Sequence, residues 1–221
     1  MAIGREQIIA AAVALLDEVG IDQLSTRKLA ERLGVQQPAL YWHFKNKRAL
    51  LDAVNDAIML ENHISRMPLP GQSWQDFVKA NARSFRASLL AHRDGARVHA
   101  GTRPGPSDLA GVSAQMRLYI DAGFEESTWV YVGIAISRYV LGSVLEEQAE
   151  KERPPEQLDT KFDDYPELKR IVTKHLVGGG PESESRTFEL GLDLIVRGLE
   201  SLLAEQKAAQ SRAATADRSQ T

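Results

Sequence analysis

The sequence predicts an all-α protein, in which a small N-terminal three-helix unit is followed by a larger helical domain. Apolar residues recur at the three-to-four-residue spacing of an amphipathic helix along most of the chain. Glycine, proline or a small polar residue stands where most of these periodic stretches begin or end. Residues 25–47 hold two much shorter stretches around one glycine, and long stretches follow at 127–149 and 184–204.

Composition places the chain among soluble globular proteins. It has 221 residues, of which 43 % are hydrophobic and 26 % charged, and this length can bury a sizeable core. It contains no cysteine, which excludes disulfides and thiolate metal sites and suits the cytoplasm. The N-terminal segment carries acids and a helical period instead of the apolar core of a signal peptide. No uninterrupted apolar run approaches the roughly 20 residues of a membrane span. We therefore expect a cytoplasmic protein with no membrane partner.

The first predicted element is an amphipathic helix over residues 5–19. Its apolar positions share one face and the stretch ends at Gly20, a common helix stop. These positions are Ile8, Ala12, Leu15, Leu16 and Val19. We expect this helix to pack across the two short helices that follow it and to complete the three-helix unit.

Residues 25–47 predict a helix-turn-helix. Residues 26–33 carry one apolar stripe and are followed by Gly34, which favours the left-handed conformation that ends a helix. A glutamine pair then precedes Pro38, which is tolerated in the first turn of a helix because its missing N–H has no partner there anyway. Two short helices around a tight turn with glycine form this DNA-binding motif.

The charge of this stretch agrees with a DNA-binding surface. Residues 24–48 contain six basic residues and one acidic residue, a net charge of +5, whereas the whole chain carries −3. A basic patch on an acidic protein is suited to phosphate. The predicted contacts with double-stranded operator DNA are Thr26, Arg27, Gln37, Pro38, Tyr41, Trp42, His43 and Lys47.

These side chains have different expected roles. Arg27 is expected to bind guanine through two hydrogen bonds, and Gln37 to contact another base edge. The remaining polar contacts should mainly position the protein on phosphates, and they are Thr26, Tyr41, His43 and Lys47. In the alternative interpretation, the aromatic pair at residues 41 and 42 belongs to the hydrophobic core.

Further helices are predicted over residues 47–65, 73–91 and 108–122, with a short helical piece that ends at His99. Asn46 is a natural N-cap for the first of them, and Ser73 opens the second with a sequence that resembles a capping box, with aspartate in place of glutamate or glutamine. The first of these helices, over residues 47–65, connects the basic three-helix unit to the rest of the chain.

The long helices predicted at 127–149 and 184–204 contain small residues at interior positions. Interior glycines cost about 1 kcal/mol each relative to alanine, so we expect them to permit close helix approach. Two such helices from each of two chains would form a four-helix dimer interface. Burial of both faces within one chain is the alternative. A charged loop is predicted at 150–166, another helix at 167–177, and a disordered tail at 207–221.

The run TRKLAERLGV-QQPALYWHFKNKRALLDA resembles the DNA-binding end of the tetracycline repressor (TetR) family. Its L-Y-x-H-F-x-N-K portion is highly specific, and the Y-W-H form resembles the members that give the family its name. The stretches SWQDFVKANARSFRASLLAHRDGARVHAGTRP and LGSVLEEQ extend the resemblance to about residues 5–205. It implies a DNA-binding domain at 1–46 and a helical ligand-binding and dimerisation domain at 47–206.

The resemblance also implies a site for a tetracycline-like inducer chelated to Mg²⁺, which releases the DNA. The residues that match the family's ligand contacts are His63, Asn81, Phe85, His99, Thr102, Arg103, Pro104 and Gln115. Of these, His99 is implied to bind the metal directly and Thr102 to hold its waters, together with Glu146 from the partner chain. An imidazole, a keto-enolate pair and waters suit an octahedral ion.

Four positions depart from the family pattern, namely Ala39 in the reading helix and Arg66, Ser137 and Arg138 near the ligand. They leave a second hypothesis open, a regulator of the same build that senses another ligand without metal. A third hypothesis is a metal-dependent hydrolase built on His63, His99 and Glu146, but no nucleophile–base spacing or HExxH pattern supports it. We therefore expect a regulator and not an enzyme.

Overall fold

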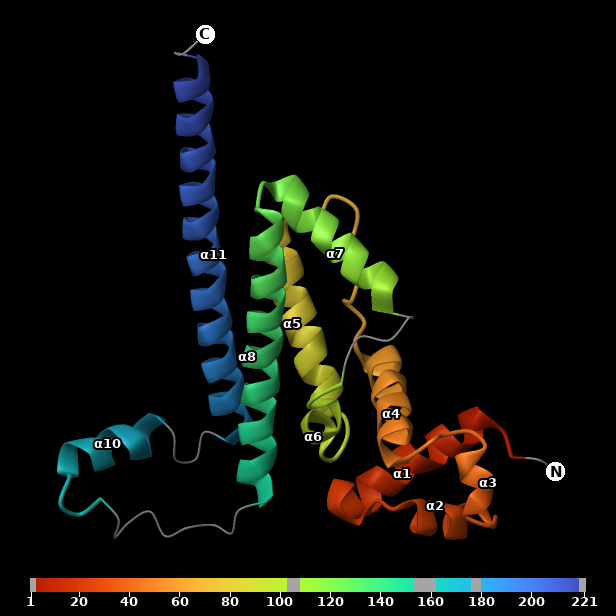
Figure 1. Ribbon diagram of the computed structural model, residues 1–221. Helices are drawn as coiled ribbons and strands as arrows, with labels where there is room; N and C mark the ends of the chain where they lie inside the picture. Colours follow the sequence, from red (N-terminus) through yellow and green to blue (C-terminus); the bar gives the residue numbers. More distant parts are fainter. Residues whose placement is uncertain (1–2, 103–107, 153–161, 176–179, 219–221) are drawn as a thin grey trace. The chain divides into compact units, whose positions relative to one another are not determined.

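The computed structural model describes residues 3–102, 108–152, 162–175 and 180–218, and within these ranges the regular structure is helical, with no β-strand (Figure 1). This confirms the predicted all-α class. The chain divides into two compact units, Met1–Gln148 and Ala149–Thr221.

The N-terminal head of the first unit consists of α1 (Arg5–Gln23), α2 (Thr26–Leu33) and α3 (Pro38–Tyr41). The Ser25 hydroxyl accepts the Lys28 N–H at the start of α2, and Gly34 ends α2 with a φ of 65°. Leu29 of α2 and Leu40 of α3 are both buried, and α2 packs against α1. The predicted three-helix arrangement is therefore present.

The regular part of α1 ends where the sequence predicts. Gly20 has a φ of 75° inside the element, and the chain continues for a further turn to Gln23. A side chain at position 20 would be strained by this φ and would also meet the Asp94 carboxylate at 2.8 Å. Glycine is therefore required here by both conformation and space.

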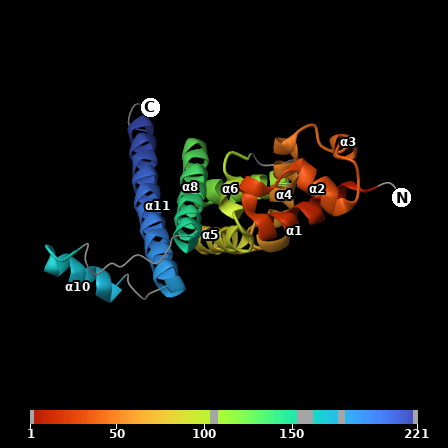
Figure 2. The same cartoon turned by 90° about the horizontal axis from the view of Figure 1, so that it is seen from below.

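Helix α4 (Lys47–Asn62) packs against α1, α5 and α6, and Figures 1 and 2 show it next to α1. The Asn46 side chain accepts the Ala49 N–H, as predicted for an N-cap. The helix ends at Asn62 and not at Ser65, because His63 leaves the helical region with a ψ of 71°. This earlier end turns the His63 side chain away from the helix and, as described below, into a cavity.

Helix α5 (Trp74–Leu90) begins at Ser73, whose hydroxyl accepts the Asp76 N–H and donates to the Asp76 carboxylate. The following turn leads into α6 (Gly95–His99), a helix of five residues. Three contacts cross from this turn to the end of α1: Ile21 N–H donates to Asp94 Oδ2 at 2.8 Å, Arg97 pairs with Asp22 at 2.7 Å, and His92 Nδ1 bonds Asp17 Oδ2 at 2.9 Å. These contacts hold the head and the helices after it in one compact unit.

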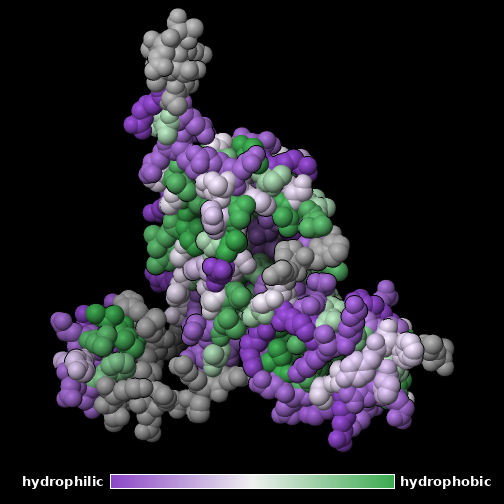
Figure 3. All heavy atoms as spheres, viewed as in Figure 1, coloured by the Kyte–Doolittle hydropathy of each residue, from purple (hydrophilic) through white to green (hydrophobic). Residues whose placement is uncertain are grey.

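Helix α7 (Leu109–Ala122) and most of helix α8 (Glu126–Glu152), as far as Gln148, complete the first unit. Near the end of α8, the Gln148 amide donates to the carbonyls of Leu89 and His92, which fixes α8 to the end of α5. Figure 3 shows apolar side chains along α8, whereas the surface of the head is mostly hydrophilic.

Among the described residues, one stretch, Glu126–Lys151 of α8, is long and apolar enough to cross a membrane by length and composition alone, with 22 % of its apolar window buried. A core helix of a soluble protein passes the same test. Arg138 interrupts this stretch, so it is not an uninterrupted apolar run of the kind that predicts a membrane span.

The second unit contains α10 (Pro166–His175) and α11 (Gly180–Arg218). In α11 one stripe is buried, formed by Phe188, Leu192, Val196, Leu199 and Leu203. The tail predicted to be disordered from residue 207 is instead helical as far as Arg218. This part of the chain is rich in alanine and has no glycine or proline after Gly198, so its helix propensity is high.

The two compact units do not coincide with the predicted domains. The contacts of α6 and α4 with α1 place residues on both sides of position 46 in the same unit, and the division falls at 148 instead. The boundary between a DNA-binding domain at 1–46 and a ligand-binding domain at 47–206 therefore stays a prediction.

Replacing Gly95 with alanine is expected to destabilise the protein strongly. A Cβ at this position would overlap the carbonyl oxygen of Leu89, which belongs to the backbone and cannot move aside cheaply. The expected loss in the free energy of unfolding is about 2 kcal/mol or more, measured by chemical denaturation.

Ala87→Gly at an exposed position of α5 gives the scale for a change in helix propensity alone, about 1 kcal/mol. A Gly95→Ala variant as stable as the wild type would mean that the turn before α6 is not packed as described.

Candidate functional site

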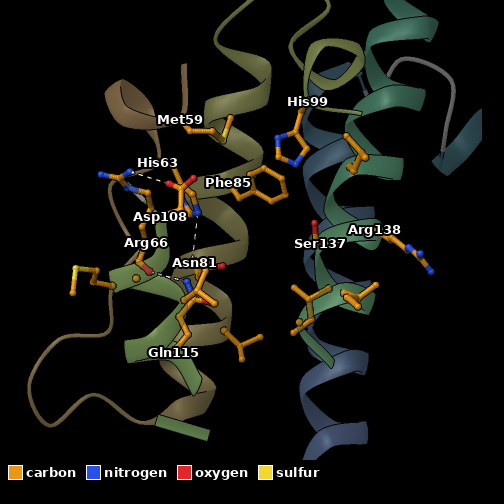
Figure 4. A pocket seen from close by; sticks show the side chains of 18 of the residues that line it. Met59, His63, Arg66, Asn81, Phe85, His99, Asp108, Gln115, Ser137 and Arg138 are labelled. Atoms are coloured by element: carbon orange, nitrogen blue, oxygen red, sulfur yellow. Dashed lines mark hydrogen bonds and ion pairs between the residues drawn. The ribbon is translucent and has the colours of Figure 1, made fainter. Parts of the chain in front are cut away.

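A cavity of about 730 Å³ lies in the first unit, lined by residues of α4, α5, α6, α7 and α8 and by the segments that follow α4 and α6 (Figure 4). Its volume is in the range of sites for drug-sized molecules. Six of the eight predicted ligand contacts line it: His63, Asn81, Phe85, His99, Thr102 and Gln115. The other two, Arg103 and Pro104, lie outside the described residues. The structure thus brings together side chains that are far apart in the sequence.

Phe85 lies between the two histidines of this cavity. Its ring centroid is 5.6 Å from that of His63 and 4.9 Å from that of His99, with an edge-to-face angle of 67° to the latter. Phe85 is also buried, so its ring contributes to the hydrophobic core as well as to the cavity wall. A flat apolar face between two polar rings suits a ligand with a ring system and polar edges.

His99 has one ring nitrogen fixed and one available. Its Nδ1 lies 2.9 Å from Oδ1 of Asn55, and because this oxygen only accepts, Nδ1 carries the proton and Nε2 keeps its lone pair. Burial lowers the pKa of His99, and the nearby Asp108 opposes part of this shift. A neutral imidazole with a fixed tautomer is the form that binds metal ions.

Asn55 is a site residue that the sequence interpretation missed. It is 5 % exposed and lies on the inner face of α4, among the apolar residues that pack the core. A buried asparagine needs a hydrogen-bond partner, so an asparagine on the apolar face of a predicted helix was the one signal in the sequence that could have pointed to this residue.

His63 is held by a chain of hydrogen bonds at the other side of Phe85. The Asn81 amide donates to the Ser65 carbonyl at 3.0 Å and lies 3.4 Å from His63 Nε2, while Nδ1 is 3.0 Å from the Ser84 hydroxyl. Burial, together with the charge of Arg66 and the neighbouring His99, lowers the pKa of His63 to about 4. Both pocket histidines are therefore neutral at pH 7.

Arg66 connects the segment after α4 to α7. Its guanidinium lies 3.7 Å from the Asp108 carboxylate, and its carbonyl accepts the Gln115 amide at 2.8 Å. Ser137 and Arg138 also line the cavity from α8, but the Arg138 side chain in Figure 4 points away from Phe85 and His99. Arg66 is therefore the departure from the family pattern that most alters the polarity inside the cavity.

The predicted metal ligands are only partly assembled. His99 and Thr102 lie together, with the Thr102 hydroxyl donating to the His99 carbonyl at 2.7 Å, whereas Glu146 is exposed on α8 and does not line the cavity. In the described parts of the chain, no three His, Cys, Asp or Glu side chains gather where they could hold a metal ion. A hydrolase site built from His63, His99 and Glu146 is therefore not formed within one chain.

The face of α3 presents aromatic side chains to solvent. Trp42 is 89 % exposed and Tyr41 is 49 % exposed, so the alternative that this pair belongs to the core is wrong. Pro38 and Lys47 are exposed as well, and His43 is half-buried. Large exposed aromatics beside a basic surface are available to a partner.

The polar side chains of α2 and α3 contact one another. The Gln37 amide donates to the Thr26 hydroxyl at 2.8 Å, and Arg27 forms an exposed ion pair with Glu31 at 2.9 Å. An exposed pair of this kind contributes little stability, so Arg27 can leave Glu31 for another partner at small cost.

Comparison with known proteins finds a family match for the N-terminal part of the chain and another for the C-terminal part. Residues 8–54 match the family described as "Bacterial regulatory proteins, tetR family", and residues 67–203 match "Tetracyclin repressor-like, C-terminal domain". The tetracycline repressor protein class C of Escherichia coli is 48 % identical over 202 residues, which cover 90 % of this chain and 91 % of that protein.

Two solved structures are similar over most of the chain. A TetR variant from Acinetobacter baumannii AYE in complex with minocycline is 42 % identical, with a TM-score of 0.75, and the match covers 90 % of this chain and 98 % of that one. TetR (class A) in complex with 5a,6-anhydrotetracycline and magnesium is 43 % identical, with a TM-score of 0.69, and the match covers 88 % and 96 %.

The lowered pKa of His63 predicts a pH-dependent stability. Between about pH 4 and pH 6.5 the unfolded chain binds a proton on this histidine that the folded chain does not. The free energy of unfolding should therefore rise with pH across this window, by on the order of 3 kcal/mol from this group, and level off above it. Chemical denaturation at a series of pH values measures the slope.

The matched variant is His63→Gln, which keeps a hydrogen-bonding side chain but does not titrate. Its slope should be shallower than that of the wild type over the same window. Parallel curves for the two proteins would show that His63 is not buried in its neutral form.

Proposed function

Because this chain belongs to the tetracycline repressor (TetR) family, we propose that it is a transcriptional repressor that a tetracycline-like ligand chelated to Mg²⁺ releases from its operator. The observation that supports the proposal most is the single cavity in which six of the expected ligand contacts meet. Such a protein works where the DNA is, in the cytoplasm, and needs no membrane.

The cavity offers the ligand both apolar and polar contacts. The Phe85 ring supplies a flat surface for a fused ring system, and the amides of Asn81 and Gln115 supply hydrogen bonds at its edge. Each amide is already fixed on one side, Asn81 by the Ser65 carbonyl and Gln115 by the Arg66 carbonyl. These contacts orient the amides before the ligand arrives, which lowers the entropy that binding costs.

The side chains near His99 fit a metal ion that arrives with the ligand. The lone pair of His99 Nε2 would hold Mg²⁺, with the Thr102 segment next to it, and Asn55 would keep the ring in the correct tautomer. When bound, Mg²⁺ supplies an octahedral centre that accepts oxygens of the ligand and of water. Glu146 lies outside the cavity of its own chain, so its expected contact with the metal's waters would have to come from a second copy.

Exposed apolar stripes support a homodimer. In α8 the exposed residues are Val130, Tyr131 and Ile134, and in α11 they are Leu190, Leu194 and Leu202. Such stripes are unfavourable in water and are suited to burial between subunits. A dimer would also place two heads on successive major grooves, roughly 34–36 Å apart.

Release from DNA would be a shift between two populations of the dimer. The ligand contacts α6 and the segment after it, and the turn before α6 is bonded to the end of α1. A movement of α6 would therefore reach the head through this turn and through α4, and would change the separation of the heads. A coupling free energy of about 1–3 kcal/mol is typical, and a strong inducer needs more.

DNA recognition is assigned to the exposed face of the head. Arg27 would exchange Glu31 for guanine, and Gln37 would contact a second base edge. Tyr41, His43 and Lys47 would position the head on phosphates, with Pro38 and Trp42 in apolar contact with the groove.

A second candidate is a regulator of the same build that binds a different ligand without metal. The ion pair between Arg66 and Asp108 favours it, because it adds two charges to a wall of the cavity. An enzymatic activity has no such support, since the family consists of regulatory proteins.

Isothermal titration of the protein with tetracycline separates the two candidates. We expect binding in the presence of Mg²⁺, with affinity at least tenfold weaker in EDTA, since the metal joins the ligand to His99. Absence of binding in both conditions would rule out the first candidate. Equal affinity with and without metal would favour a metal-independent ligand site.

Replacing His99 with alanine should weaken induction without weakening the DNA complex. The variant loses the proposed metal contact but no residue of the head, so operator affinity should stay within about threefold of wild type and release should need at least tenfold more ligand. Electrophoretic mobility shifts with increasing tetracycline and Mg²⁺ measure both quantities. Asn81→Ala is the matched control, because it removes a ligand contact and should leave the Mg²⁺ dependence of release unchanged. If operator binding itself collapsed in the His99→Ala variant, the histidine would be structural.

A further inference from the structure

We propose that Arg66 is a specificity-determining residue of the cavity, and that the cavity takes a fused-ring ligand with a carboxylate at the end away from His99. The guanidinium of Arg66 binds this carboxylate, whereas His99 serves the end of the ligand that chelates the metal. The inference rests on the proposed ligand-binding function and narrows its ligand to an acidic class.

The described lining of the cavity contains more positive than negative charge. Its charged side chains are Arg66, Asp108 and Arg138, and both cavity histidines are neutral at pH 7. Arg138 is exposed and points away from Phe85 and His99 in Figure 4. Arg66 is therefore the better placed of the two arginines to contact a ligand that lies on the Phe85 ring.

Arg66 lies at the edge of the cavity that His63 forms. In Figure 4, Arg66 and His63 are on one side of the Phe85 ring and His99 is on the other. Burial and then the positive charge of Arg66 lower the pKa of His63, so the guanidinium is close enough to act on the imidazole. A ligand on Phe85 can therefore present one end to His99 and the opposite end to Arg66.

The backbone that carries the Arg66 side chain is fixed from two helices. On α5, the Ser84 hydroxyl accepts the Ser65 N–H at 3.0 Å, and the Asn81 amide donates to the Ser65 carbonyl at 3.0 Å. On α7, the Gln115 amide donates to the Arg66 carbonyl at 2.8 Å. A cation that projects from a fixed backbone loses less conformational entropy when a ligand binds to it.

The ion pair with Asp108 leaves Arg66 able to bind a second anion. Arg66 Nη1 lies 3.7 Å from Asp108 Oδ1, whereas a charge-assisted hydrogen bond measures about 2.7–2.9 Å. The side chains are 33 % and 29 % exposed, so the pair contributes little stability. A guanidinium matches a carboxylate through two parallel hydrogen bonds. A ligand carboxylate can therefore make the closer contact, with Asp108 as a weaker competitor for the same cation.

The experiment compares two flat probes that differ in one group. Rhein is a dihydroxyanthraquinone with a carboxylate, and aloe-emodin has a hydroxymethyl group in its place, whereas both share the keto–hydroxyl edge that can chelate a metal. Each probe is titrated into the full-length protein with Mg²⁺ and in EDTA, because a carboxylate can also bind a metal ion. Quenching of tryptophan fluorescence reports binding, since Trp129 lines the cavity.

The wild type should bind rhein about tenfold or more tightly than aloe-emodin in both conditions, since a hydrogen-bonded charge pair is lost with the hydroxymethyl group. Arg66→Gln keeps a polar side chain without the charge. It should reduce this ratio below about threefold by weakening rhein alone. Asp108→Asn removes the competing anion and should strengthen rhein binding by about threefold or more.

The matched control is Arg117→Gln, which removes the same charge from an exposed position of α7 that does not line the cavity. The ratio between the two probes should not change in this variant. Arg138→Gln tests the second arginine of the lining and should also preserve the ratio. Loss of the ratio in Arg138→Gln and not in Arg66→Gln would assign the carboxylate to α8 and overturn the inference.

Three further outcomes overturn the inference: no preference or no binding of either probe in the wild type, a preference that appears only with Mg²⁺, and equal weakening of both probes by Arg66→Gln. Thermal unfolding shows whether each variant is folded. If Arg66→Gln is not, Asp108→Asn tests the same contact, because its effect on rhein requires the guanidinium. Tetracycline with Mg²⁺ is titrated in parallel. Its failure to bind would count against the proposed function, whereas the ratio between the two probes decides this inference.

Discussion

The hydrogen bond from the Ile21 N–H to the buried Asp94 carboxylate joins the two functional regions of the molecule. It spans 73 positions in the sequence and measures 2.8 Å. Asp94 is 7 % exposed and adopts a left-handed conformation with a φ of 56°, which aspartate tolerates better than most residues. A second oxygen of the same carboxylate accepts Arg97, so the charge is compensated inside the turn. Because α6 follows at once, a residue of the cavity lies only five positions from the contact with the head.

Helix α4 provides a second connection between the same regions. Its N-cap Asn46 follows the exposed α3, Asn55 at its centre bonds the cavity residue His99, and His63 directly after its end lines the cavity. The residues that would sense a ligand and those that would contact DNA are thus carried by, or bonded to, one rigid helix. Two independent connections between the regions suit a protein whose DNA affinity depends on an occupied cavity.

Most of the helices could be predicted from the sequence because their ends have local causes. Ser25, Gly34 and Asn46 act through residues within four positions, so the pattern of letters contains the information. Residues 207–218 were expected to be disordered because of their composition, but a stretch with alanine and without glycine or proline favours the helix that they form. The pocket residues came from family resemblance, and no spacing rule would have gathered them. What could not be predicted is the set of contacts that cross the fold: Asn55 with His99, Asp94 with Ile21, Gln37 with Thr26 and Arg66 with Asp108. Each needs a knowledge of which helices are neighbours.

The left-handed turn at Asp94 has a consequence for how such a protein can diversify. Its position combines an unusual backbone conformation, a bond to the head and a neighbouring glycine with no room for a side chain, so almost any replacement is harmful. The walls of the cavity are under no comparable restriction, as the arginine at position 66 illustrates. A substitution in the cavity wall can therefore change which ligand such a regulator binds, and it leaves the turn that joins the cavity to the head intact.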